Sequence, residues 1–165
     1  MFEKSKYVVC GNKGVCRIED IATLEMGGVD KSRVYYILKP IYANSSTVYL
    51  PVDTAQGHLR EVISKEDANA LLDTMKGLEI IKIRDERNVE MQYKESMQSG
   101  KCEELAKLLK TVHARKKARI EKGTKITAVD MKYHKLAEDT LSGELAVALG
   151  ITKQETELMI ENILA

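Results

Sequence analysis

The apolar residues of this chain change their spacing near residue 64. Before that point, short runs of β-branched and aromatic residues, such as 34–38, alternate with clusters of Gly, Pro and Asn. After it, apolar residues recur at every third or fourth position, as they do in the stretch 105–112. The first pattern favours strands and the second favours amphipathic helices. We therefore predict an α+β protein with two domains, residues 1–63 and residues 64–165.

The first domain is predicted to be a small antiparallel β barrel. Its second strand is expected to end near Gly27 and Gly28, a pair that suits a hairpin. Turn residues stand at 11–14, at Pro40 and at 44–46. Short strands joined by tight turns are typical of such a barrel. The predicted strands are residues 7–10, a run from 15 through 21, 34–38 and 47–50.

The second domain is predicted to be a bundle of about five helices. Ser64, Thr127 and Thr152 each stand where a helix N-cap is expected, and Thr152 with Glu155 makes a capping box. Gly residues mark the helix ends. The first predicted helix begins near residue 65, and the second runs over 83–98. The third ends by residue 123, the fourth runs from 127 to 150, and the fifth follows residue 152.

Motifs that carry chemistry are missing from the sequence. The three histidines and three cysteines form no pair with the spacing of a metal site, and no phosphate-binding loop or nucleophile elbow is present. We therefore expect no enzyme activity, no metal and no cofactor. Three cysteines in no disulfide pattern favour reduced thiols in the cytoplasm. No signal peptide and no membrane-spanning run is visible, so no membrane partner is expected.

Charge is distributed unevenly along the chain. The formal net charge is only +1, but residues 82–135 hold fifteen Lys and Arg against eight Asp and Glu, whereas residues 136–165 hold one against six. Such asymmetry indicates a basic interaction surface, although a well-solvated helical segment shows the same pattern. Basic residues without interleaved aromatics favour contact with a duplex backbone. The candidate DNA-binding residues are Arg84, Arg87, Lys94, Arg115, Lys116, Lys117 and Arg119.

The stretch 145–152 and the helix after it resemble a helix-turn-helix. The second helix would enter the DNA groove, but it carries Glu155, Glu157 and Glu161 against a single Lys153. Negative charge there repels phosphate. We interpret this hairpin as structural packing, with DNA reading as the alternative.

Short runs along nearly the whole chain resemble the CarD/CdnL group of bacterial transcription regulators. The first domain is similar to the polymerase-interacting module that this group shares with transcription-repair coupling factors. Each run alone is a weak signal, and their order and spacing carry the resemblance. The runs are residues 7–9, 18–21, 35–38, 47–52, 85–87, 93–95, 99–102, 116–117, 127–130, 136–141 and 143–146.

The resemblance implies a Tudor/SH3-like barrel that binds the RNA polymerase β subunit through an exposed strand. It also implies a helical domain that contacts promoter DNA and stabilises the open complex, in a protein that is monomeric when free. Family members commonly place a Trp near the start of the helical domain, where this chain, which has no Trp, has Lys82. The residues implied to bind polymerase are Thr47, Val48, Tyr49, Leu50 and Pro51.

Three hypotheses follow for the function, of which an unrecognised enzyme with its site between the two domains has no supporting motif in the sequence. The leading one is a transcription regulator that binds both polymerase and DNA, with Lys82 among its DNA contacts. The alternative is an adaptor that binds polymerase without significant DNA contact, which the near-neutral total charge and the missing Trp favour. Salt-dependent retention on duplex DNA separates the two, because phosphate contacts weaken steeply as salt rises.

Overall fold

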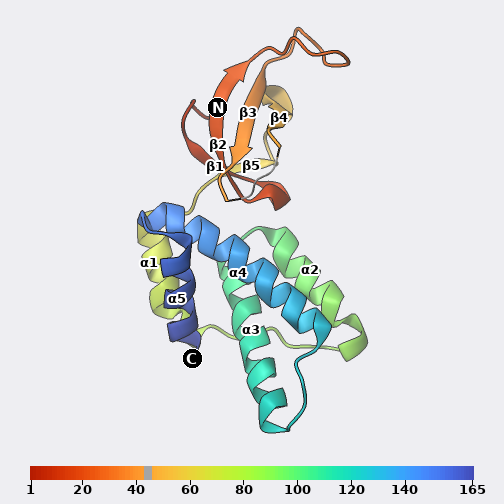
Figure 1. Ribbon diagram of the computed structural model, residues 1–165, viewed down its shortest axis with the longest axis vertical. Coiled ribbons are helices and arrows are strands. Elements are labelled where there is room, and N and C mark those ends of the chain that lie inside the picture. The colour runs from red at the N-terminus through yellow and green to blue at the C-terminus, as the bar shows by residue number, and fades with distance from the viewer. Residues whose placement is uncertain (43–45) are drawn as a thin grey trace. The chain divides into compact units, whose positions relative to one another are not determined.

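The computed structural model describes residues 1–42 and 46–165, and its chain divides into two units, Met1–Val62 and Ile63–Ala165. A five-stranded antiparallel sheet forms the first unit, and five α-helices form the second (Figure 1). The predicted α+β class is therefore confirmed. The turn expected at 44–46 falls, apart from Ser46, outside the described residues.

The sheet of the N-terminal unit has the strand order β4-β3-β2-β1-β5. All recorded strand pairs are antiparallel, and in the described part of the chain the pairing ends at β4 on one side and at β5 on the other. The four strands expected from the sequence are present, and β5 is additional. The strands are β1 (Tyr7–Cys10), β2 (Val15–Ala22), β3 (Tyr35–Pro40), β4 (Val48–Pro51) and β5 (Leu59–Glu61).

The connection between β2 and β3 differs from the prediction. We expected the strand to reach Gly27 and Gly28, but β2 ends at Ala22 and residues 23–34 form a longer loop. The side chain of Asp30 accepts hydrogen bonds from the amide and the hydroxyl of Ser32, at 2.9 and 2.6 Å. Such local bonds from a short acidic side chain favour a turn over a strand.

The buried core of the N-terminal unit lies on one face of the sheet. Alternate strand residues point to the same face, so Val8, Cys16, Ile18, Tyr36 and Leu38 form one buried cluster. The hydroxyl of Tyr36 is satisfied inside this cluster, because it accepts a hydrogen bond at 2.9 Å from the backbone amide of residue 2. The N-terminal segment is thereby tied to the sheet.

Five helices build the second unit, and local capping explains where most of them begin. The side chains of Ser64, Thr127 and Thr152 accept hydrogen bonds from backbone amides three residues later, and Thr152 with Glu155 forms the predicted capping box. The helices are α1 (Lys65–Thr74), α2 (Val89–Ser99), α3 (Cys102–Glu121), α4 (Ala128–Leu149) and α5 (Lys153–Leu164).

The helix predicted over 83–98 starts later than expected. Residues 78–85 form no helix, a 3₁₀ turn follows at Glu86–Asn88, and α2 begins only at Val89. Along this segment Ile81 and Ile83 are partly buried, whereas Lys82 and Arg84 between them are exposed. That alternation is the strand period of two, and β-branched Ile also disfavours a helix.

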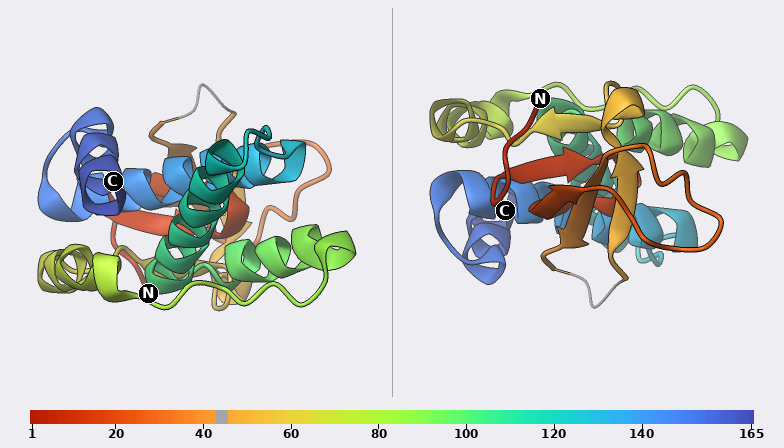
Figure 2. Two further views of the ribbon diagram at one scale, coloured as in Figure 1. Left: turned by 90° about the horizontal axis from the view of Figure 1, so that it is seen from below. Right: turned by 90° about the horizontal axis from the view of Figure 1, so that it is seen from above.

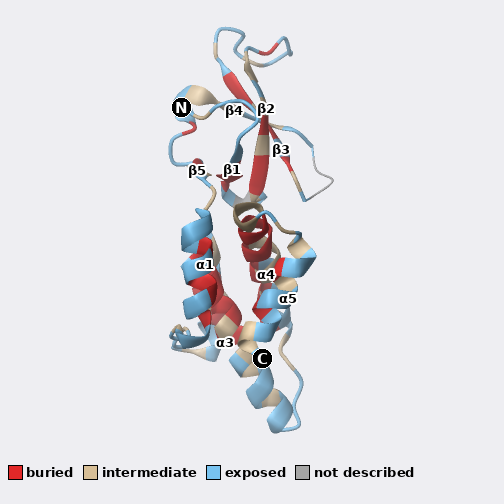
Figure 3. Cartoon of the chain, turned by 90° about the vertical axis from the view of Figure 1, so that its left-hand side faces the viewer, coloured by how far each residue is buried: buried red, intermediate tan, exposed pale blue. Residues whose placement is uncertain are grey.

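Helix α3 crosses α4, with α1 and α5 near one end of α4 and α2 near the other (Figures 1 and 2). The facing stripes are buried, as the red segments in Figure 3 show, and include Leu105 and Leu109 of α3 and Leu141 and Leu145 of α4. Burial of such side chains stabilises a fold by about 1.5–3 kcal/mol each. This core fixes the helix faces that carry the candidate site.

Candidate functional site

Strand β4 holds four of the five residues implied to bind polymerase. Val48, Tyr49, Leu50 and Pro51 form the strand, and Thr47 immediately precedes it. Among the described residues β4 pairs only with β3, so its other side is an open edge of the sheet. Open edges present backbone donors and acceptors to an added strand.

The register of β4 shows which backbone groups face that edge. The amide of Val52 donates to the carbonyl of Val34 at 2.9 Å, and antiparallel pairs alternate between hydrogen-bonded and non-hydrogen-bonded. The pair Tyr36–Leu50 is therefore hydrogen-bonded, whereas the pair Ile37–Tyr49 is not. It follows that the N–H and C=O groups of Tyr49 point away from β3, toward the open edge.

Pro51 fits this register. It stands opposite Tyr35, in a non-hydrogen-bonded pair, so its missing N–H removes no bond of the β3–β4 ladder. The side chains of Val48 and Leu50 pack partly against the core, and that of Tyr49 is exposed. The edge therefore offers one complete donor and acceptor pair beside one exposed aromatic ring.

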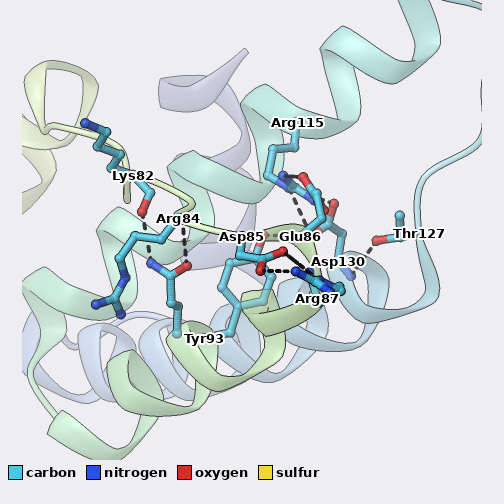
Figure 4. Close-up of polar contacts among 10 residues, drawn as sticks. Lys82, Arg84, Asp85, Glu86, Arg87, Tyr93, Arg115, Thr127 and Asp130 are labelled. Atoms are coloured by element: carbon cyan, nitrogen blue, oxygen red, sulfur yellow. Dashed lines mark hydrogen bonds and ion pairs between the residues drawn. The ribbon is translucent and has the colours of Figure 1, made fainter.

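Arg115, expected to contact DNA, lies in a network of ion pairs that joins α3 to α4 and to the turn before α2 (Figure 4). Its Nη1 and Nη2 atoms donate to the two carboxylate oxygens of Glu86 at 2.7 and 3.0 Å. Its Nε atom donates to Oδ2 of Asp130 at 3.0 Å. The hydroxyl of Tyr93 donates to Oδ1 of Asp130 at 2.7 Å. The guanidinium group is thus hydrogen-bonded to one carboxylate through Nη1 and Nη2 and to another through Nε. Because these donors are engaged, we leave Arg115 out of the proposed DNA surface.

This network shifts the ionisation of its members. The hydrogen bonds from Arg115 hold the pKa of Glu86 below its usual range. Burial, together with the hydrogen bond to the Asp130 carboxylate, raises the pKa of Tyr93. The same partners raise the pKa of Arg115 itself, with the Glu86 hydrogen bonds as the largest cause. At neutral pH, Glu86 is therefore ionised, Arg115 is protonated and Tyr93 keeps its hydroxyl proton.

Three other expected DNA contacts each have an acidic side chain within 4.0 Å. Arg87 pairs with Asp85 at 3.2 Å, Lys94 with Glu90 at 3.9 Å, and Arg84 with Glu95 at 4.0 Å. All three side chains are more than half exposed. Surface pairs of this kind contribute about 0–1 kcal/mol, so these cations remain available to phosphate.

Apart from Lys82, which lies in the segment before α2, the remaining expected contacts lie near the C-terminal end of α3, which extends past the other helices of its unit (Figures 1 and 3). Lys116 and Lys117 are exposed and Arg119 is half-exposed. Within the described ranges, no ion pair is recorded for these three side chains. Helical geometry spreads them around the helix instead of along one stripe. Together with Lys122 and Lys125 of the following loop, they make this end of the unit basic on several sides.

Helix α5 does not fit the role of a DNA-reading helix. Its single cation, Lys153, pairs with Asp139 at 3.1 Å and with Glu157 at 4.0 Å. The acidic side chains Glu155 and Glu161 are exposed. This surface repels a phosphate backbone, which supports the interpretation of the α4–α5 hairpin as packing.

The sequence analysis missed Gln92. This residue of α2 is buried, and its side-chain amide clamps the extended segment before the helix: Oε1 accepts from the amide of Arg84 at 3.1 Å, and Nε2 donates to the carbonyl of Lys82 at 2.9 Å (Figure 4). A glutamine inside a polar-looking helical stretch gives no sequence signal for such a role, because its partners lie eight and ten residues away.

No cluster of three His, Cys, Asp or Glu side chains able to hold a metal ion occurs among the described residues. A cavity of about 180 Å³ has His113, His134, Glu138 and Glu161 among its lining residues. In the same part of the chain, no helix has the length and apolarity needed to cross a membrane.

The N-terminal unit is similar to a known protein-family model. Residues 2–63 match the model described as the CarD-like/TRCF RID domain. No curated protein matches the chain. The match covers the N-terminal unit and supports a CarD-like RNA polymerase-interacting module there, as the resemblance implied. Apart from Ile63, the helical unit lies outside the matched range.

Proposed function

We propose that this chain is a non-enzymatic transcription regulator that binds the RNA polymerase β subunit through β4 and promoter DNA through its helical unit. The observation that carries the proposal is the family match over residues 2–63, which spans a sheet whose β4 edge is open. A partner strand added at this edge would pair with the outward N–H and C=O groups of Tyr49. Main-chain pairing of this kind supplies affinity with modest sequence demands.

The second part of the proposal is the contact with DNA. The cations at the end of α3, with Lys82, Arg84, Arg87 and Lys94, would neutralise phosphates without reading bases. A regulator held on polymerase by its first unit brings these weak contacts to the promoter at high effective concentration. If the bound unit contacts melted promoter better than closed promoter, it shifts that equilibrium toward the open complex by mass action alone.

The test uses the full chain, polymerase and a promoter fragment. We expect micromolar or tighter binding to the isolated β subunit, and a longer open-complex lifetime when the chain is added to polymerase. No binding to the β subunit by the folded chain would overturn the first part. Binding without any effect on open-complex lifetime would overturn the second.

An adaptor that binds polymerase without DNA is the second candidate. It is favoured by the engagement of Arg115 in the ion-pair network and by the acidic surface of α5. The two candidates differ in one measurement. An adaptor shows no salt-dependent affinity for duplex DNA. For the proposed regulator, the logarithm of the affinity falls linearly with the logarithm of the salt concentration.

A further inference from the structure

The segment before α2 is held extended by side chains from two helices. Besides the Gln92 clamp, the hydroxyl of Thr111 on α3 accepts a hydrogen bond at 2.8 Å from the amide of Ile81. The Nζ atom of Lys110, also on α3, donates to the carbonyl of Lys76 at 2.6 Å and to that of Leu78. Side chains therefore satisfy backbone groups that a helix or a sheet satisfies with its own backbone.

These contacts fix which side chains of the segment face solvent. Ile81 and Ile83 pack against the core of the helical unit, so Lys82 and Arg84 point the other way. Figure 4 shows both of these side chains apart from the Arg115 network. No ion pair of Lys82 is recorded within the described chain, and Arg84 has only the 4.0 Å contact with Glu95. The segment thus presents two cations whose positions are set by its backbone.

We infer that Gln92 and Thr111 are positioning residues that hold Lys82 and Arg84 as a preformed pair for neighbouring phosphates of duplex DNA. Cations two residues apart on an extended backbone start from Cα atoms about 6.6 Å apart, a spacing comparable to that of successive phosphates on one strand. Preorganised side chains bind with less loss of conformational entropy than side chains on a mobile loop. The inference rests on the proposed contact between the helical unit and DNA.

The test is a double-mutant cycle on duplex binding by the full chain, followed over a series of salt concentrations. The double variant K82Q/R84Q removes both charges, and we expect its salt slope to fall by about two units, with affinity lower by up to roughly 60-fold at 0.1 M salt. Gln92→Ala leaves every charge in place. We expect it to lower the slope by one to two units, because the pair no longer meets the phosphates together.

The cycle separates positioning from a general structural role. Added to the K82Q/R84Q background, Gln92→Ala is expected to have no further effect on DNA affinity, since it acts only through that pair. An equal loss in both backgrounds would overturn the inference. Thr111→Val, which keeps the shape of the side chain and removes the acceptor for Ile81, is a second variant should Gln92→Ala not fold. It is expected to behave in the same way.

Two further outcomes are distinguishable. If the wild-type chain binds duplex DNA and K82Q/R84Q has the same salt slope as the wild type, this inference is overturned and the proposed function is left intact. Wild-type chain without salt-dependent binding would overturn the DNA part of the proposed function, and the inference with it. Exchange of the Arg84 amide proton gives a check without DNA: it is expected to be slow in the wild type and at least about tenfold faster in Gln92→Ala.

Discussion

Arg115 on α3 donates to Asp130 on α4 across 3.0 Å, and the Asp130 side chain is completely buried. Asp130 also accepts from Tyr93 of α2, while its backbone amide donates to the side chain of Thr127. The carboxylate thereby joins α4 to α2 and α3, and the backbone amide of the same residue binds the cap of α4. A buried charge with this many partners is costly to leave unpaired, and the folded arrangement of the three helices depends on Arg115.

The first prediction concerns this pair. Arg115→Ala leaves the Asp130 carboxylate buried with one fewer cation, and we expect the free energy of unfolding to fall by about 3 kcal/mol. Lys117→Ala, two residues along the same helix but exposed, is the matched control and is expected to stay within about 0.5 kcal/mol of wild type. Urea unfolding followed by circular dichroism measures both. A stable Arg115→Ala variant would show that the network is not structural.

The second prediction concerns pH. The hydrogen bonds from Arg115 lower the pKa of Glu86 in the folded state. A carboxylate with a lowered pKa stabilises the fold above its unfolded pKa, near 4.5, and that contribution is lost as pH falls through the folded pKa. We therefore expect unfolding free energy to decline less steeply below about pH 4.5 in Glu86→Gln than in the wild type. Parallel curves for the two proteins would contradict the assignment. Glu86 is exposed, so the difference is expected to be small.

The third prediction concerns the cations at the end of α3. Lys116 and Lys117 are exposed, and we expect each change to Gln to lower the salt slope of duplex binding by about one unit. Lys107, on the same helix, is only 29% exposed and pairs with both Glu103 and Glu104, at 3.6 and 3.5 Å. Lys107→Gln is therefore the control for loss of charge alone, with an unchanged slope expected. An equal effect at all three positions would mean that net charge, and not this surface, controls binding.

Local signals in the sequence were sufficient to predict much of the fold. Ser64, Thr127 and Thr152 mark helix starts because each cap needs only a hydroxyl and an amide three residues away. The strands were found for the same reason, since alternation and turn residues are local. The helix start at Val89 was missed because the segment before it is held by Gln92 and Thr111, and contacts over eight to thirty residues leave no local pattern.

The candidate site was less predictable than the fold. Arg115 is one of a run of cations in the sequence, and nothing there distinguishes it from Lys116 or Lys117. Its partners Glu86 and Asp130 lie 29 and 15 residues away, and only the packing of α3 against α4 and against the turn before α2 brings them together. Charge patterning identifies a basic region, and tertiary structure decides which of its cations are free.

The most direct test of the account is binding of Tyr49→Pro to the isolated polymerase β subunit. Proline at this position removes the outward N–H group and places its ring at the open edge, while the β3–β4 bonds through Val48 and Leu50 are kept. Tyr49→Thr changes the side chain but keeps the N–H group, and serves as the control.

We expect Tyr49→Pro to remain folded and to bind the β subunit at least about tenfold more weakly than the wild type, a loss of about 1.4 kcal/mol or more. Tyr49→Thr is expected to stay within about threefold of the wild type. Wild-type affinity in a folded Tyr49→Pro variant would contradict strand addition at β4, and with it the central claim that this edge is the polymerase-binding surface.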